Sequence, residues 1–136
     1  MYEKPFKLQI ITPGKVVFQD GATSVSAPGT LGGFQILCDH APLISTIEVG
    51  ELKVKDTKGN DLLYATSGGF VEVKDNNVVV LAETAELATE IDVDRAKAAG
   101  ERASARLHSA DPGIDLDRAR FAMVRSLNRL RVASKA

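Results

Sequence analysis

The sequence of 136 residues is poor in the residues that build disulfide frameworks and metal centres. It contains one cysteine, Cys38, and only two histidines. A single thiol excludes an intramolecular disulfide. One cysteine and two histidines are also too few to form a recognisable metal-binding motif. A reducing compartment fits this composition.

Long apolar runs and a strongly basic charge are missing as well. No stretch approaches the ~20 apolar residues that span a bilayer, and residues 1–5 lack the hydrophobic core of a signal peptide. The formal net charge of −1 argues against a nucleic-acid-binding protein of the usual basic kind. We therefore expect a cytosolic protein, or one held at a membrane only through partners, with no nucleic-acid ligand and no direct membrane insertion.

Arginine is absent from the first 94 residues. Residues 1–90 contain 7 Lys+Arg against 12 Asp+Glu, whereas residues 91–136 contain 10 against 6. The second part alone therefore carries planar, permanently charged guanidinium groups, which suit carboxylates and phosphates. All of them follow residue 94: Arg95, Arg102, Arg106, Arg118, Arg120, Arg125, Arg129 and Arg131.

The first part reads as a succession of short strands. Apolar residues alternate from about residue 6 to 83, and turn signals such as Asp20-Gly21 and Gly68-Gly69 recur at short intervals. This pattern predicts an N-terminal antiparallel β-sandwich or flattened barrel over residues 1–84. The expected strands lie at 6–11, 15–18, 23–26, 34–37, 52–55, 62–65, 70–73 and 78–81.

The second part reads as a C-terminal two-helix antiparallel hairpin over residues 91–136, after a connection at 85–90. Helices are expected at about 91–108 and 114–133, with Asp92 as an N-cap and a break at the Pro112-Gly113 pair. Their apolar stripes are rich in alanine, so the helices can approach closely but bury little area, and a hairpin that opens is physically reasonable. The stripes consist of Val93, Ala96, Ala99, Ala103 and Leu107, and of Leu116, Ala119, Met123, Leu127 and Leu130.

The arginines of each expected helix form one row, with spacings of 7 and 4. Arg95, Arg102 and Arg106 make the first row; Arg118, Arg125 and Arg129 make the second. One interpretation is a pair of solvated faces supported by neighbouring acids. The other is an anion site between the rows, for a triphosphate or for a partner's acidic segment. No Walker-type glycine loop is present, so a bound nucleotide would be sensed and not hydrolysed.

A catalytic role finds little support in the first part. His40 follows Asp39 directly, but adjacent residues in a strand or turn point apart, and no nucleophile with a base accompanies them. We interpret His40 as a structural or interface residue and Cys38 as a small buried hydrophobe. We expect no enzyme activity of the chain's own.

Several motifs in one order resemble the epsilon subunit of F-type ATP synthases, a bacterial one in particular. The segment His40-Ala41-Pro42-Leu43 is followed by Gly50-Glu51-Leu52, and Ile91-Asp92 precedes Arg95-Ala96. The resemblance covers about Phe6 to Val132. The chain departs from the family at Cys38-Asp39, where a Pro-Gly or Pro-Asn pair is frequent, and at Gly33, where an acid is frequent.

The resemblance implies a non-catalytic central-stalk subunit that couples proton translocation to ATP synthesis. It would lie peripherally at the cytoplasmic face of the bacterial plasma membrane, with the gamma subunit and the c-subunit ring as partners. In this family the hairpin can extend, restrain ATP hydrolysis and meet an acidic segment of the beta subunit. The implied subunit-interface residues are Thr12, Gly33, His40, Ala41, Pro42 and Leu43.

The resemblance also implies a regulatory ATP site, although no cofactor is required and no metal site is expected. Ile91 and Ala96 would form an apolar wall for adenine, Asp92 a hydrogen-bonding carboxylate, and three arginines the phosphate forks. An alternative is a free-standing nucleotide-binding sensor without a rotor. The implied ATP-binding residues are Glu86, Ile91, Asp92, Arg95, Ala96, Arg102, Arg125 and Arg129.

Overall fold

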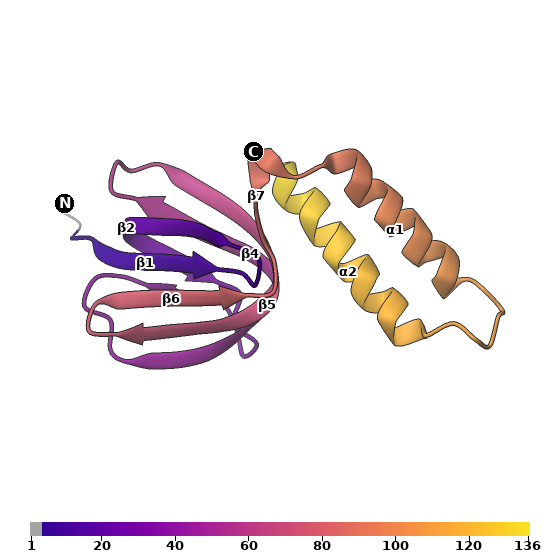
Figure 1. The fold of residues 1–136 in the computed structure, drawn as a ribbon, viewed down its shortest axis with the longest axis horizontal. Coiled ribbons are helices and arrows are strands. Elements are labelled where there is room, and N and C mark those ends of the chain that lie inside the picture. Colours follow the sequence, from indigo (N-terminus) through magenta and orange to yellow (C-terminus); the bar gives the residue numbers. More distant parts are fainter. Residues whose placement is uncertain (1–3) are drawn as a thin grey trace. The chain divides into compact units, whose positions relative to one another are not determined.

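The structure, a computed structural model, describes residues 4–136. The chain divides between Leu87 and Ala88 into two compact units, here called unit 1 and unit 2. Unit 1 is built of strands and unit 2 of helices (Figure 1). The expected fold class, strands followed by a helical hairpin, is confirmed. No helix within residues 4–136 is both long enough and apolar enough to cross a bilayer.

Unit 1 closes its sheet into a flattened barrel. The hydrogen-bonded order is β1-β6-β5-β4-β2-β3, and β1 also pairs with β2, so the path returns to its start. The β1–β6 pair is parallel and the other strand pairs are antiparallel. The strands are β1 (Phe6–Ile11), β2 (Val16–Ala27), β3 (Phe34–Ile36), β4 (Leu43–Asp56), β5 (Asp61–Lys74), β6 (Asn77–Ala82) and β7 (Ala85–Leu87), which pairs with β5.

The interior of unit 1 is filled by branched aliphatic side chains. Successive residues of β1 and β6 alternate between buried and more exposed positions, as the period-two pattern predicts. Leu8, Ile10, Leu52 and Val71 are all but inaccessible to solvent. Burying each such side chain contributes about 1.5–3 kcal/mol, so this core can sustain unit 1 on hydrophobic burial.

Two expected turns are wrong, because their glycines lie within long strands. Asp20-Gly21 belongs to β2, and Gly68-Gly69 belongs to β5. Gly69 has φ +148°, and a Cβ there would collide with the carbonyl oxygen of Leu81 on the neighbouring strand. Glycine therefore marks a close backbone approach inside a continuous strand at this position.

Unit 2 contains a short 3-10 turn, η1 (Ala88–Glu90), followed by α1 (Val93–Leu107) and α2 (Leu116–Ala133). Each helix starts after an aspartate cap: the Arg95 N–H donates to Asp92 Oδ1 at 3.0 Å, and the Arg118 N–H donates to Asp115 Oδ1 at 3.1 Å. The expected N-cap Asp92 is confirmed. The helices lie side by side in opposite directions (Figure 1).

The connection expected at 85–90 is partly wrong, since residues 85–87 pair with β5 as strand β7. The apolar stripe expected on α2 is also partly wrong. Leu116 and Leu127 are 43% and 57% exposed, whereas Ser126 is 2% exposed. The stripe is rotated because helix contact selects the small residues, which let the backbones approach, over the larger leucines.

Candidate functional site

A contact between Gly100 of α1 and Ser126 of α2 sets the register of the hairpin. A Cβ built on Gly100 would lie 2.6 Å from Ser126 Oγ, so only a glycine fits without movement. The Ser126 hydroxyl donates to the Ala96 carbonyl at 2.7 Å, and this bond is buried. Ala96, Ala103 and Ser126 are each exposed by 2% or less. We call the facing positions Ala96, Gly100, Ala103, Ala119 and Ser126 the seam.

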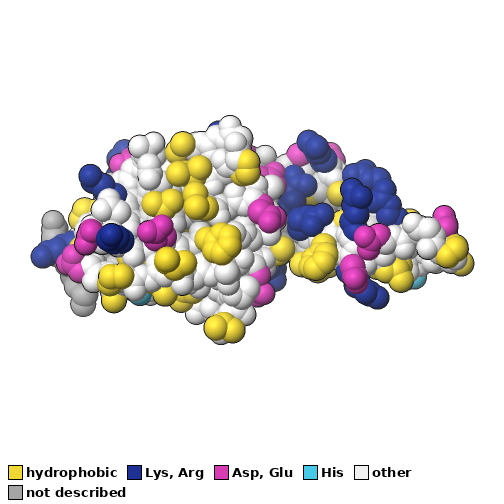
Figure 2. Space-filling model, turned by 60° about the horizontal axis from the view of Figure 1, so that its bottom comes forward, with side chains coloured by type: hydrophobic (Ala, Val, Ile, Leu, Met, Phe, Trp, Pro, Cys, Tyr) yellow, Lys and Arg dark blue, Asp and Glu magenta, His cyan; other side chains and the backbone are white. Residues whose placement is uncertain are grey.

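The two arginine rows lie on one face of the hairpin. On each helix, the arginine row lies roughly 100° around the helix axis from the seam, and the direction of this rotation is the same for α1 and α2. Two antiparallel helices are related by a two-fold axis perpendicular to the plane that contains them. This axis maps each face of the hairpin onto itself, so the two rows lie on the same face. Figure 2 shows Lys and Arg side chains gathered over the helices of unit 2.

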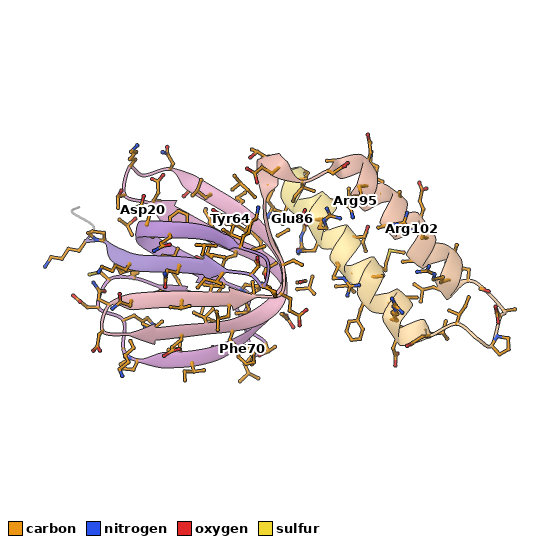
Figure 3. The ribbon with its side chains drawn as sticks, in the orientation of Figure 1. Asp20, Tyr64, Phe70, Glu86, Arg95 and Arg102 are labelled. Atoms are coloured by element: carbon orange, nitrogen blue, oxygen red, sulfur yellow. The ribbon has the colours of Figure 1, made fainter. Side chains whose placement is uncertain are left out.

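The register also matches the rows level by level. Arg102 lies two residues beyond Gly100, and Arg125 one residue before Ser126, so these two arginines lie at nearly the same height. Arg95 lies five residues before Gly100 and Arg129 three residues after Ser126, so these two arginines also lie at similar heights along the hairpin. Figure 3 shows Arg95 and Arg102 on α1, two turns apart. The structure therefore brings together, on one face, the four arginines that the resemblance assigns to the ATP site.

The acids of unit 2 leave much of this arginine face uncompensated. Asp117 pairs with Arg120 at 2.9 Å, and the carboxylates of Asp92 and Asp115 are engaged as helix caps. Within residues 4–136, the side chains of Arg102 and Arg125 have no ion-pair partner. Such a concentration of guanidinium groups attracts an anion with several charged oxygens.

The other residues expected to bind ATP lie in different settings. Ile91 is 8% exposed and Ala96 belongs to the seam with no exposure, so neither offers an open apolar wall in this conformation. Asp92 is exposed but accepts the cap bond from Arg95 N. Glu86 belongs to unit 1, where β7 sets it opposite Ala65 of β5 (Figure 3).

Unit 1 presents a row of apolar side chains on its outer surface. Phe70 of β5 is paired with Leu81 of β6, and Leu81 with Ile11 of β1, which in turn is paired with Val16 of β2. Phe70, Leu81 and Val16 are 54%, 50% and 50% exposed, and Ile44, diagonal to Phe70 on β4, is 76% exposed. We call these five residues the apolar row; Figure 2 shows hydrophobic side chains spread over this unit.

Sequence reasoning missed most of the apolar row. The signal in the sequence was an apolar residue at an outward-facing strand position, such as Phe70, which directly precedes the alternation of buried Val71 and Val73 with exposed Glu72. Outward apolar residues on neighbouring strands become significant only when the register places them side by side. Without the strand pairing, Phe70 and Leu81 are merely single exposed positions.

The segment that holds His40 is anchored to the β5–β6 turn. The Asp39 N–H donates to Asn76 Oδ1 at 2.8 Å, and Asp39 has φ +60°. This left-handed conformation favours glycine, asparagine and aspartate, and Asp39 occupies it here. His40 Nδ1 lies 2.7 Å from the Ala41 carbonyl oxygen. Cys38 is half-buried, not buried as expected, and its thiol lies 3.7 Å from the Pro5 carbonyl oxygen.

The remaining expected interface residues come from separate segments of unit 1. Thr12 donates its hydroxyl to the Lys15 carbonyl at 3.1 Å, in the turn directly after Ile11 and so beside the apolar row. Leu43 is half-buried and packs against the core. Gly33, Ala41 and Pro42 are exposed in the segments that flank β3.

A closed strand barrel followed by a capped helical hairpin defines a two-unit protein, and comparisons with known proteins identify its family. Residues 5–88 match the model of the ATP synthase Delta/Epsilon chain beta-sandwich domain, and residues 89–134 match that of its long alpha-helix domain. The chain belongs to the delta/epsilon chain family of ATP synthases. The resemblance drawn from the sequence motifs is confirmed.

Bacterial relatives match over nearly the whole chain. The ATP synthase epsilon chain of Desulforamulus reducens is 48% identical over 96% of this chain and 98% of its own length. That of Syntrophomonas wolfei is 43% identical over 99% of this chain and 98% of its own.

Solved structures share the fold at low sequence identity. A chain of the Euglena gracilis mitochondrial ATP synthase (OSCP/F1/c-ring) superposes with a TM-score of 0.81 at 22% identity, covering 97% of this chain and 82% of that one. A chain of the Tetrahymena thermophila mitochondrial ATP synthase (central stalk/c-ring) superposes with a TM-score of 0.55 at 17% identity, covering 99% of this chain and 98% of that one.

Proposed function

We propose that the chain is a non-catalytic central-stalk subunit of a bacterial F-type ATP synthase. It couples proton translocation to ATP synthesis and lies peripherally at the cytoplasmic face of the plasma membrane. Unit 1 docks on the rotor, and unit 2 regulates ATP hydrolysis. Family membership supports the assignment to the complex; the apolar row and the arginine face support the two roles.

The apolar row is the surface that binds the gamma subunit. Contiguous exposed apolar side chains mark protein interaction sites, and Phe70 and Leu81 are large, adjacent and half-exposed. The turn that contains Thr12 extends this surface beyond β1. The exposed segment with Gly33, His40, Ala41 and Pro42 contacts the ring of c subunits, and the Asp39–Asn76 bond holds part of that segment in place.

Co-purification with the gamma subunit tests this docking role. Phe70→Glu places a charge in the apolar row, so we expect at least a tenfold loss of retained gamma, because a buried unpartnered charge is costly. Leu31→Glu is the matched control, since the Leu31 side chain is fully exposed and lies outside both the apolar row and the segment from Gly33 to Pro42. Equal retention by the two variants contradicts the assignment of the surface.

The arginine face is a sensor site for ATP. Arg102, Arg125 and Arg129 hold the phosphates, and Arg95 and Asp92 order the start of α1 beside them. Ile91 and Ala96, which are buried in the closed hairpin, contribute to the side of the base and ribose once the hairpin loosens locally. ATP favours the folded hairpin to the extent that it binds this state more tightly than the extended one. In the extended state the same arginines pair with an acidic segment of the beta subunit.

Titration calorimetry of the isolated chain tests the sensor site. We expect ATP to bind, and Arg102→Gln and Arg125→Gln each to weaken binding about tenfold, as loss of a charge-assisted contact would. Arg120→Gln is the control, because Arg120 already pairs with Asp117 at 2.9 Å. Absence of heat at millimolar ATP rejects the site and leaves the stalk assignment standing.

The second candidate function is a free-standing nucleotide sensor without a rotor. The arginine face favours it, because that face needs no partner protein to bind a triphosphate. The two functions differ in one observable property, since a free-standing sensor binds ATP but does not co-purify with gamma.

A further inference from the structure

We propose that Ser126 is a positioning residue that holds the hairpin closed and sets the arginine face. Its hydroxyl bonds across the seam to the Ala96 carbonyl at 2.7 Å, directly above Gly100. The inference rests on the proposed ATP site for its functional consequence, and on geometry alone for its structural one.

Loss of the bond from Ser126 to Ala96 should destabilise the closed hairpin, because both groups are buried. Ser126 is 2% exposed and Ala96 is not exposed, so water does not replace the hydroxyl when the bond is lost in the closed state. The carbonyl of Ala96 is also the one that accepts the Gly100 N–H within a regular helix, so Ser126 adds a second donor to it. One hydroxyl thus ties α2 to the backbone of α1.

Ser126 is also adjacent to the residues it positions. Arg125 precedes it and Arg129 follows three residues later, while Gly100 opposite is two residues from Arg102. A shift of α2 along or away from α1 would therefore separate the paired levels of the arginine face. The side chain of Ser126 points into the seam and not toward the arginines, so it acts on an anion only through the helix positions.

Gly100 and Ser126 form a matched pair that permits a decisive set of variants. Gly100→Ala places a Cβ 2.6 Å from Ser126 Oγ but 3.5 Å from Ser126 Cβ, and the second distance is an ordinary contact. Gly100→Ala must therefore displace the Ser126 hydroxyl from its bond to Ala96, and we expect the helices to move apart as a result, whereas Gly100→Ala with Ser126→Ala relieves the clash. Alanine favours helix over glycine, so any opening in Gly100→Ala does not arise from loss of helicity.

Hairpin closure is measured in the full chain by the distance between two spin labels. Lys97→Cys and Leu127→Cys place the labels on the face opposite the arginines, and Cys38→Ser removes the native thiol. Without ATP, we expect one short distance in the parent chain and a longer population in Gly100→Ala at undiminished helicity by circular dichroism. Ser126→Ala raises the open population about two- to tenfold, the effect of one hydrogen bond, and the double variant matches Ser126→Ala.

The ATP titration separates positioning from ligand contact. We expect Gly100→Ala to weaken ATP binding more than Ser126→Ala, and ATP to shorten the label distance in both. Arg125→Gln keeps the short distance without ATP but weakens binding. Equal distance distributions for the parent chain and Gly100→Ala, or for Gly100→Ala and the double variant, overturn the proposal. If neither the parent chain nor any variant binds ATP, the proposed ATP site is rejected. The label distances measured without ATP still decide whether Ser126 holds the hairpin closed.

Discussion

The two units of the molecule are stabilised in different ways. Unit 1 surrounds an interior of valine, leucine and isoleucine with a closed sheet, whereas the seam of unit 2 contains alanine, glycine and serine. Large buried side chains contribute strongly to the free energy of unfolding of unit 1. The small side chains of the seam let the helices of unit 2 approach closely but bury little apolar area, so they hold the helices together only weakly. The difference supports the proposal that unit 1 docks and that the hairpin of unit 2 opens and closes.

The largest expected effect comes from truncating the core of unit 1. Leu8→Ala removes a side chain that is 1% exposed, and we expect the free energy of unfolding to fall by about 2–5 kcal/mol. Ile44→Ala, at 76% exposure, should change it by no more than about 0.5 kcal/mol. Urea unfolding followed by circular dichroism measures both; similar losses would show that the core does not dominate unit 1.

A backbone change in unit 1 comes next. Gly69→Ala must adopt φ +148° and meets the Leu81 carbonyl, so we expect a loss of about 1–3 kcal/mol. Gly59→Ala, at φ +84° in an open turn with nothing near its Cβ, isolates the conformational part of that loss. If Gly59→Ala costs as much, the close approach in β5 contributes nothing.

In unit 2 a helix cap should contribute more than the exposed ion pair on the same helix. Asp115→Ala removes the acceptor of the Arg118 N–H bond, and we expect helix stability to fall by about 1 kcal/mol. Asp117→Ala, which breaks the exposed pair with Arg120, should cost less than about 0.5 kcal/mol. Amide hydrogen exchange along α2 reads out both changes, and equal protection in the two variants would contradict the cap assignment.

The smallest effect is a dependence on pH in the β4–β5 turn. The backbone N–H of Asn60 donates to Asp56 at 2.8 Å and lowers the pKa of that carboxyl, and further bonds from Asn60 and Lys58 act the same way. Because the folded pKa is depressed, the stabilisation is present above the unfolded pKa of about 3.9 and disappears as pH falls through the folded value. Melting temperatures of Asp56→Asn and the parent chain should therefore differ slightly at neutral pH and converge in acid.

Much of this architecture could be predicted from local patterns. Alternation found part of each strand from β1 to β6, but it divided β2 and β5 and missed residues 43–51 of β4. Asp92 with Pro112-Gly113 found the limits of the helices to within about two residues. The prediction of a turn at Gly68-Gly69 was wrong, because the sequence alone does not distinguish a glycine required by a close backbone approach from a glycine in a turn. Strand β7 is only three residues long and depends on pairing with β5.

The candidate sites divide in the same way. The arginine rows follow from helical periodicity, since spacing alone puts Arg95 and Arg102 on one side of a helix. Their meeting on one face depends on the register at Gly100 and Ser126, which no single helix encodes. The apolar row likewise needs the pairing of Phe70 with Leu81, a contact between different strands.

The central claim is that unit 1 docks the chain and unit 2 regulates. ATP hydrolysis by the reassembled ATP synthase tests it directly, with either the full chain or a chain ending at Leu87. We predict that the shortened chain assembles as well as the full one and that hydrolysis rises. Equal hydrolysis by complexes that hold the two chains in equal amounts would contradict the regulatory role of the hairpin.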